Sequence, residues 1–177
     1  MNISNEQAEL RFRSATVDDL AAIAELESKE FMPLAYPYFA LRQLFDIHGS
    51  QWVVADLDGS ICGYALVAVG RRSAWLIGLA VSSRYQGQGL GRSLLDRALA
   101  RCRSSQVEAI FITVRPSNVP ATNLYKDSGF TWLDHEEQYF GAGEPRDLLV
   151  HRVSPDWSAA DPADRRWRKD RGPLDDG

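Results

Sequence analysis

Three glycines within six residues separate an apolar strand from a long amphipathic helix, in the segment 86–91 with the sequence QGQGLG. The strand is predicted over 74–81. The helix is predicted to begin at Leu90, because apolar residues recur at helical spacing as far as Cys102. Glycine lets the backbone turn tightly and lets an anion approach the N–H groups. The first turn of the helix adds unpaired N–H donors and a positive dipole end, so this segment predicts a pyrophosphate site.

Two common phosphate-binding motifs do not fit this glycine turn. The strand before it ends an antiparallel meander, whereas a dinucleotide-binding fold would place it in a βαβ unit. A Walker loop would need lysine after the last glycine, where this chain has Arg92 followed by Ser93. Arg84 and Arg92 flank the turn and could add charge-assisted contacts to a phosphate.

The chain as a whole predicts an α+β fold with a mixed, mostly antiparallel sheet of about seven strands and about four helices. The predicted strands are 10–13, 52–55, 61–69, 74–81, 107–114, 130–140 and 148–153. The predicted helices are 20–31, which Pro33 ends, 38–47, 90–102, and one that Ser117 or Asn118 caps and Gly129 stops. Asp58-Gly59 predicts a hairpin turn between the second and third strands.

Length and composition predict a single domain that does not span a membrane. The length of 177 residues suits a single domain, and a net charge of -4 excludes a general nucleic-acid binder. The two cysteines are too few for a disulfide scaffold, and no metal-ligand cluster stands out, so no metal is predicted. The N-terminus lacks a signal-peptide core, and no apolar run approaches the ~20 residues of a membrane span. A cytoplasmic protein is predicted, either a monomer or a homodimer.

The character of the sequence shifts after Val153. The segment 154–177 mixes three prolines and six aspartates with five basic residues, together with Trp157 and Trp167. Such a segment is typical of a tail that is flexible or loosely packed through its tryptophans. We therefore predict a folded domain over 1–153 and a tail over 154–177.

The sequence resembles the GCN5-related N-acetyltransferases (the GNAT family) in two motifs. Their acetyl-CoA motif, Gln-x-x-Gly-x-Gly after a Leu-Ala-Val strand, is similar to 79–81 with 86–91. Their second motif, Asn, then Ala, Leu-Tyr and Gly-Phe, is similar to 118–130. Both motifs lie in the family's order and separation, and a looser match extends from Leu10 to about Val153. The resemblance implies the family's fold, in which the sheet splays apart beside the acetyl-CoA strand.

The resemblance also implies a role for each matching residue. Asn118 would bond the pantetheine arm of acetyl-CoA, which does not conflict with a helix-capping role. Tyr125 would lie near the sulfur and act as general acid for the leaving thiolate. Backbone groups for the pantetheine arm would come from Leu79, Ala80 and Val81. The pyrophosphate would be held by Gln86, Gly87, Gln88, Gly89, Leu90, Gly91 and Arg92.

The chain departs from the subgroup it resembles most, the bacterial enzymes that acetylate the N-terminus of a ribosomal protein. Those enzymes have Glu-Val-Arg before a Ser-Asn pair, with the glutamate as base, whereas this chain has Thr113 at that position. An attacking amine must lose a proton, so another route is needed. Thr113 could order a relaying water, or the substrate amine could already be neutral. A residue from elsewhere is the third route, with the candidates Glu27, Glu30, His135 and Glu137.

The acceptor side of the site is predicted from the same resemblance. Where the subgroup often has Tyr-Tyr, a turn and Glu-Asp, residues 139–147 read YFGAGEPRD. Tyr139 would then line the acceptor pocket and Glu144 would lie close to it. Phe31 and Tyr36 lie on the first helical hairpin, where they either rim the acceptor pocket or fill the core.

These observations predict an N-acetyltransferase that moves an acetyl group from acetyl-CoA to a primary amine by direct attack. The amine would belong to a small molecule or to a peptide N-terminus. The alternative is a non-catalytic acyl-CoA-binding regulatory module, which the missing carboxylate at Thr113 favours and the presence of Tyr125 disfavours.

Overall fold

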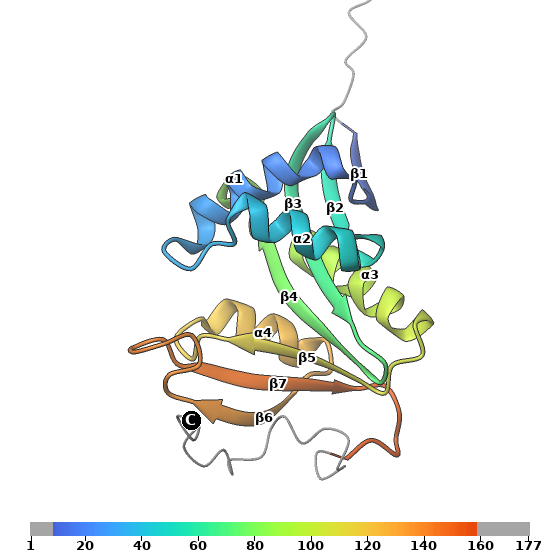
Figure 1. The fold of residues 1–177 in the computed structure, drawn as a ribbon, viewed down its shortest axis with the longest axis vertical. Helices are drawn as coiled ribbons and strands as arrows, with labels where there is room; N and C mark the ends of the chain where they lie inside the picture. Colours follow the sequence, from blue (N-terminus) through green and yellow to red (C-terminus); the bar gives the residue numbers. More distant parts are fainter. Residues whose placement is uncertain (1–8, 159–177) are drawn as a thin grey trace, which may run out of the picture.

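The computed structural model describes residues 9–158, which form a seven-stranded sheet with the order β1-β2-β3-β4-β5-β7-β6 (Figure 1). All neighbouring strands are antiparallel except β4 and β5, which are parallel. The strands are β1 (Leu10–Ser14), β2 (Val53–Leu57), β3 (Ser60–Val69), β4 (Ser73–Val81), β5 (Ala109–Val114), β6 (Thr131–Glu136) and β7 (Arg146–Arg152). The predicted fold class is confirmed.

Four α-helices cover the two faces of this sheet (Figure 1). One face carries α1 (Leu20–Phe31) and α2 (Tyr38–His48), and the other carries α3 (Leu90–Ser104) and α4 (Val119–Asp127). Short 3-10 helices precede α1, β2 and α3, namely η1 (Val17–Asp19), η2 (Gly49–Gln51) and η3 (Ser83–Tyr85). The side chains of β3 pack into two cores, one on each face of the sheet, because alternate side chains of a strand point to opposite faces. Tyr64 and Leu66 face α1 and α2, whereas Ala65 and Val67 face α3.

Local sequence signals account for the main element ends. Asp19, in the third position after Thr16, accepts a hydrogen bond from the Thr16 backbone N–H (2.7 Å), which fixes the entry to α1. Asp58 and Gly59 both have positive φ values, 49° and 85°, as a two-residue hairpin turn between β2 and β3 requires. Asn118 rather than Ser117 caps α4, since its Oδ1 accepts from the N–H of Ala121.

The strand predicted over 130–140 is wrong beyond Glu136. The chain instead makes tight turns, in which the N–H of Gly141 donates to the carbonyl of Gln138 and the N–H of Phe140 donates to the carbonyl of Glu144. These bonds turn the backbone back before β7 begins, so residues 137–145 form a loop. Strand β5 likewise begins at Ala109, two residues later than predicted.

The segment after Val153 contributes at least one core side chain. Trp157 is buried, and its ring packs edge-on against Phe111, which in turn stacks on Trp75. Trp167 lies outside the described residues. The division between a domain at 1–153 and a tail stays a prediction.

The sheet opens between β4 and β5. The two strands pair only where Ser73, Ala74 and Trp75 lie opposite Ala109, Ile110 and Phe111. Beyond Trp75 the β5-facing edge of β4 has no strand partner in the described part of the chain. The backbone groups of that edge are therefore open to another extended molecule.

Candidate active site

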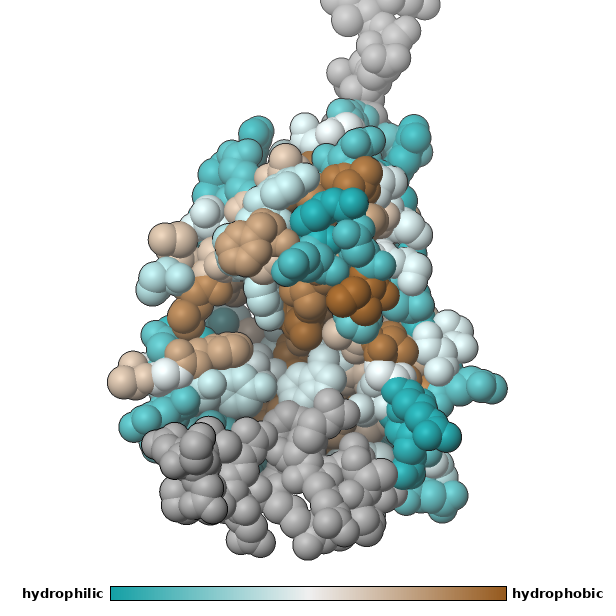
Figure 2. Space-filling model, viewed as in Figure 1, coloured by the Kyte–Doolittle hydropathy of each residue, from teal (hydrophilic) through white to brown (hydrophobic). Residues whose placement is uncertain are grey.

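Two cavities occupy the opening between β4 and β5, with volumes of about 650 Å³ and about 430 Å³. Figure 2 shows a hollow below α1 and α2 on this face, with apolar side chains around it. The cavities share part of their lining and therefore meet. The shared residues are Glu30, Phe31, Leu79, Asn118, Ala121 and Tyr125. The first cavity lies toward α1 and β7, and the second toward the glycine turn.

The second cavity is built against the glycine turn and the start of α3. Gly87, Leu90 and Gly91 line it, together with Val81 and Gln86. The side-chain amide of Gln86 donates to the carbonyl of Val81 (2.9 Å), which holds the turn against the end of β4. Ala80 and Leu79 complete the strand side of this cavity, as predicted.

The first turn of α3 leaves donors free at this cavity. Gly89 is the N-cap with φ 84°, and its carbonyl accepts the first helical bond, from the N–H of Ser93 (3.0 Å). The N–H groups of Leu90, Gly91 and Arg92 come before that bond, so they have no acceptor within the helix. A Cβ added at Gly87 or Gly89 would meet no atom within 4 Å, so space remains above the turn. Free donors, a dipole end and open space together suit an anion.

The two arginines beside the turn point elsewhere. The Arg92 guanidinium donates to the carbonyl of Asp127 (3.1 Å) and to the Ser128 hydroxyl (3.0 Å). Arg84 lies over the ring of Tyr85, at 5.6 Å from the ring centroid. Gln88 donates to the carbonyl of Arg84 and, like Arg92, is absent from the lining of both cavities. The charge-assisted arginine contacts expected from the sequence would need these side chains to move.

Tyr125 lies where the two cavities meet. Its side chain projects from α4 and packs edge-on against Phe130, with ring centroids 5.9 Å apart. Only 6% of the residue is exposed, and burial raises the pKa of its phenol well above the ordinary value. The hydroxyl makes no hydrogen bond within the described residues and stays protonated at neutral pH. It is therefore an available proton donor at the junction.

Thr113 lines the first cavity from β5, and no carboxylate replaces it on that strand. Of the acidic and histidine candidates from the sequence, Glu27 and Glu30 line the same cavity. His135 and Glu137 do not line this cavity. His135 instead contacts Asp147 through Nδ1 (2.8 Å) and Glu137 through Nε2 (3.2 Å). The structure thus brings two of these candidates to the site.

Glu27 is the buried carboxyl group of this site, with 2% of the residue exposed. One carboxyl oxygen accepts a hydrogen bond from the Tyr64 hydroxyl, and the other accepts from the backbone N–H of Tyr36 (2.9 Å). Burial raises the pKa of Glu27, despite these two bonds to its charged form. A carboxyl group whose pKa is moved toward neutrality inside a cavity suits proton transfer.

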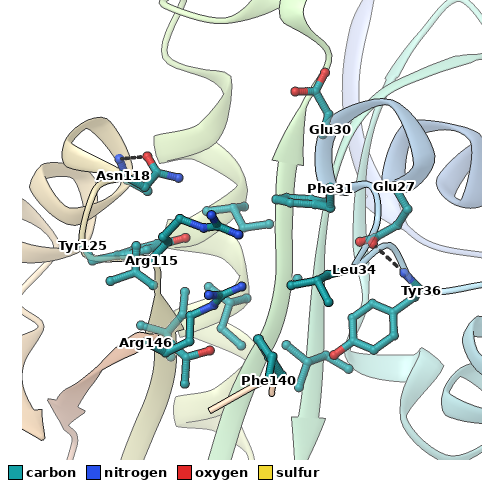
Figure 3. Close-up of a pocket in the computed structure, with 18 of the residues that line it drawn as sticks. Glu27, Glu30, Phe31, Leu34, Tyr36, Arg115, Asn118, Tyr125, Phe140 and Arg146 are labelled. Atoms are coloured by element: carbon teal, nitrogen blue, oxygen red, sulfur yellow. Dashed lines mark hydrogen bonds between the residues drawn. The ribbon is translucent and has the colours of Figure 1, made fainter. Parts of the chain in front are cut away.

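Of the four residues predicted on the acceptor side, two line the first cavity and two do not. Phe31 and Tyr36 line the first cavity, on the wall that α1 and the loop after it provide (Figure 3). Tyr139 and Glu144 are absent from the lining. The Glu144 carboxylate instead accepts hydrogen bonds from Arg115 (2.5 Å) and Arg146 (3.1 Å).

Among the lining residues that the sequence does not single out, three carry polar or aromatic side chains from β5 and the chain around β7: Arg115, Phe140 and Arg146. Arg115 stands two residues after Thr113, so the strand period could have placed it on the same side of the sheet opening. Arg146 and Phe140 come from the chain around β7, whose pairing with β5 is not sequential. No local pattern carries that information.

Among residues 9–158 no group of three or more histidine, cysteine, aspartate or glutamate side chains is arranged to hold a metal ion. Within the same range no helix has the length and apolar character needed to cross a membrane.

Comparisons with known proteins agree with this geometry. An N-alpha-acetyltransferase from Sulfolobus acidocaldarius is 26% identical over 160 residues, which is 83% of this chain and 95% of that protein. The [ribosomal protein bS18]-alanine N-acetyltransferase of Escherichia coli K12 is 31% identical over 145 residues, 80% of this chain and 95% of the relative. A chain in the crystal structure of the NatC complex bound to Gag peptide and CoA has the same fold, with a TM-score of 0.77 at 18% identity. That match covers 82% of this chain and 99% of the other.

The sequence model of the acetyltransferase (GNAT) family matches residues 20–130, a stretch that contains both motifs and the sheet opening. The chain therefore belongs to the acetyltransferase (GNAT) family.

Proposed function

We propose that this protein transfers an acetyl group from acetyl-CoA to a primary amine, by direct attack of the amine on the thioester. The observation that carries the proposal is the meeting of two cavities at Tyr125, in the gap between β4 and β5. One cavity has the features of an anion site at a helix N-terminus. The other has carboxyl groups and an apolar wall suited to an amine-bearing acceptor.

The donor would lie in the second cavity. Its pyrophosphate would take the free N–H groups of the turn, contributed by Gln86, Gly87, Gln88, Gly89, Leu90, Gly91 and Arg92. The Arg92 side chain is already engaged, so its backbone N–H would make the contact. The pantetheine arm would run along the open edge of β4 at Leu79, Ala80 and Val81, as an added strand does. Asn118 caps α4 with Oδ1, which leaves its amide N–H₂ for the arm.

The chemistry balances with groups of this chain. The amine nitrogen forms a bond to the thioester carbonyl carbon, and a backbone N–H on the open edge of β4 stabilises the oxyanion. Collapse of that intermediate breaks the carbon–sulfur bond. The leaving thiolate takes the Tyr125 proton, and the phenolate recovers a proton from solvent or from the amine relay.

The proton lost by the amine needs an acceptor on the other side. We propose that Thr113 orders a water that receives this proton and that Glu27 is its final acceptor. Both residues line the first cavity, and the raised pKa of Glu27 makes its carboxylate a better base than an exposed glutamate. Glu30 is a weaker candidate because of its position: it also lines the donor cavity, and its carboxylate contacts the N–H of Ser83 and the amide of Gln86 beside the glycine turn.

The acceptor is a primary amine of a small molecule or of a peptide N-terminus. The names of the two curated relatives, N-alpha-acetyltransferase and ribosomal-protein alanine N-acetyltransferase, support the peptide. Phe31 and Tyr36 would then contact the acceptor, with Tyr139 and Glu144 behind the lining. The cytoplasmic location and the monomeric or homodimeric state stay predictions.

The alternative function is an acyl-CoA-binding module without turnover. The absence of a carboxylate at Thr113 favours it, whereas a free phenol at the cavity junction favours the enzyme. The test is release of free thiol from acetyl-CoA, measured against a panel of small amines and peptides with free N-termini. Release with one class of acceptor supports the enzyme and names its substrate class. Binding of acetyl-CoA by calorimetry, with no release from any acceptor, would replace it with the binding module.

A further inference from the structure

Two arginines stand on one wall of the first cavity, Arg115 at the end of β5 and Arg146 at the start of β7 (Figure 3). They are neighbours because β5 and β7 pair in antiparallel register, with Val114 opposite Asp147. Phe31 and Tyr36 form the opposite wall. An acceptor in this cavity would therefore contact the guanidinium groups on one side and aromatic rings on the other.

One carboxylate holds both guanidinium groups. Glu144 Oε2 accepts from Nη2 of Arg115 (2.5 Å) and from Nη1 of Arg146 (3.1 Å). Two positive charges against one negative charge leave the cluster with one net positive charge. The Arg146 side chain is 10% exposed and stacks on the Phe140 ring, at 4.7 Å from the ring centroid. The cluster is therefore fixed in place before any ligand arrives.

The two guanidinium groups keep unused donors. Besides its bond to Glu144, Arg146 makes one hydrogen bond, from Nη1 to the carbonyl of Pro145 (2.7 Å). Arg115 makes no hydrogen bond other than the one to Glu144 within the described residues. Among residues 9–158, no acceptor bonds Nε or one of the two terminal nitrogens of either group. A guanidinium presents its N–H donors in a planar fork that matches a carboxylate. One further carboxylate would also balance the remaining charge.

The same cavity has the opposite character across from the arginines. Glu27 and Glu30 both come from α1, and Figure 3 shows them on the far side from Arg146. The cavity is thus polarised, with acids on the α1 side and an uncompensated positive charge on the β7 side. A molecule that carries both an ammonium and a carboxylate group would match both ends.

We propose that Arg115 and Arg146, positioned by Glu144, bind a carboxylate of the acceptor, an inference that rests on the acceptor role proposed above for this cavity. The acceptor then carries a carboxylate near its amine. Two sources share this chemistry, the α-carboxylate of an amino acid and an acidic side chain beside the N-terminus of a peptide.

Paired acceptors that differ only in the carboxylate test the proposal. The first arm compares leucine with leucinamide, and the second compares the amide of leucyl-glutamate with the amide of leucyl-glutamine. For each pair, kcat/KM comes from thiol release, and Kd comes from calorimetry on the protein loaded with CoA. The proteins are wild type, Arg115→Gln, Arg146→Gln and, as a matched control, Arg97→Gln. Arg97 also stacks on a ring, that of Phe12, and is absent from the lining of both cavities.

In one arm the ratio of the carboxylate twin to its neutral twin is expected to be higher in wild type than in the arginine variants, and that arm identifies the source. The loss of one charge-assisted contact should lower the twin ratio by roughly 10-fold to 100-fold in Arg115→Gln and Arg146→Gln. Arg97→Gln should keep the wild-type ratio. The different basicity of the twin amines cancels, because each ratio is compared between proteins. Melting curves show whether the buried Arg146 variant is folded, and the more exposed Arg115 tests the site if it is not.

Twin ratios that neither arginine variant changes, in both arms, would overturn the proposal. The calorimetric arm separates this result from failure of the proposed function. If no acceptor releases thiol but the carboxylate twin binds more tightly in an arginine-dependent way, the carboxylate site stands and the transfer reaction is wrong.

Discussion

The hydroxyl of Tyr64 donates a hydrogen bond to the carboxyl group of Glu27, and neither residue is exposed by more than 2%. This contact joins the middle of β3 to α1 beneath the first cavity. Burial raises the pKa of the Glu27 carboxyl above 4.5, so the folded protein holds this proton more tightly than the unfolded chain does.

Glu27 should therefore make the stability of the fold depend on pH in a defined direction. Its contribution is fully present below pH 4.5 and is lost as the pH rises toward the folded-state pKa. Glu27→Gln does not titrate, so the stability of wild type relative to this variant should fall across that window. Denaturant unfolding at a series of pH values measures the difference. Glu25→Gln on the exposed face of α1 is the control, since Lys29 lowers the pKa of Glu25 and the trend should not appear. Parallel curves for wild type and Glu27→Gln would contradict the raised pKa.

Glu27→Gln should also lower turnover if its carboxylate is the final proton acceptor. General-base catalysis contributes about 10²-fold to 10⁴-fold, so kcat should fall by a factor in that range while acetyl-CoA affinity is kept. The pH profile of kcat should lose its acid limb in the variant. Tyr64→Phe is the companion variant, because it removes the bond to Glu27 but keeps the carboxyl. An unchanged kcat in a folded Glu27→Gln protein would assign Glu27 a purely structural role.

Gly89→Glu should abolish CoA binding without a special effect on folding. The new carboxylate would face the pyrophosphate, and the loss of about two charged hydrogen bonds weakens affinity by roughly 100-fold. Gly59→Glu is a closely matched control, because Gly59 has φ 85° against 84° for Gly89 and equally open space around its Cβ position. Both variants carry the same left-handed backbone cost, about 1–2 kcal/mol. Calorimetric titration measures the CoA affinity of each variant. Equal affinities would contradict the placement of the pyrophosphate at the glycine turn.

Trp157→Ala tests whether the fold ends at Val153. The Trp157 ring is buried against Phe111, so its truncation should cost about 3–5 kcal/mol of the free energy of unfolding. Trp132→Ala on β6 is the control, since that side chain is 58% exposed and its loss should cost much less. Thermal melting measures both. If Trp157→Ala melts with wild type, the packing of this segment adds nothing and the predicted boundary at 153 is adequate.

Signals contiguous in the sequence predicted the fold and the donor side of the site. The Asp58-Gly59 turn, the cap at Asn118 and the glycine turn before α3 each place an element within a few residues. Each depends on local backbone geometry or local hydrogen bonding, which neighbouring residues determine.

The arginine wall of the acceptor side was beyond the reach of the sequence, because it depends on contacts between distant segments. The shared bond of Arg115 and Arg146 to Glu144 needs β5 and β7 to pair although α4 and β6 lie between them in the chain. The sequence names Glu27 as one of four candidate bases, but its contact with the Tyr64 hydroxyl again joins distant segments and no local pattern predicts it. The overlong strand predicted at 130–140 failed for a local reason, since hydrogen bonds within residues 138–144 turn the backbone after β6 has ended at Glu136.

Turnover and acetyl-CoA affinity of Tyr125→Phe, measured side by side with wild type, test the central claim most directly. If the junction of the two cavities is the acetyl-transfer site, the variant should bind acetyl-CoA with wild-type affinity, because the phenol makes no hydrogen bond within residues 9–158. Its amine-dependent thiol release should fall by about 10²-fold, since only the proton donor is lost. Equal rates of thiol release in the two folded proteins would contradict the account and remove Tyr125 from the chemistry.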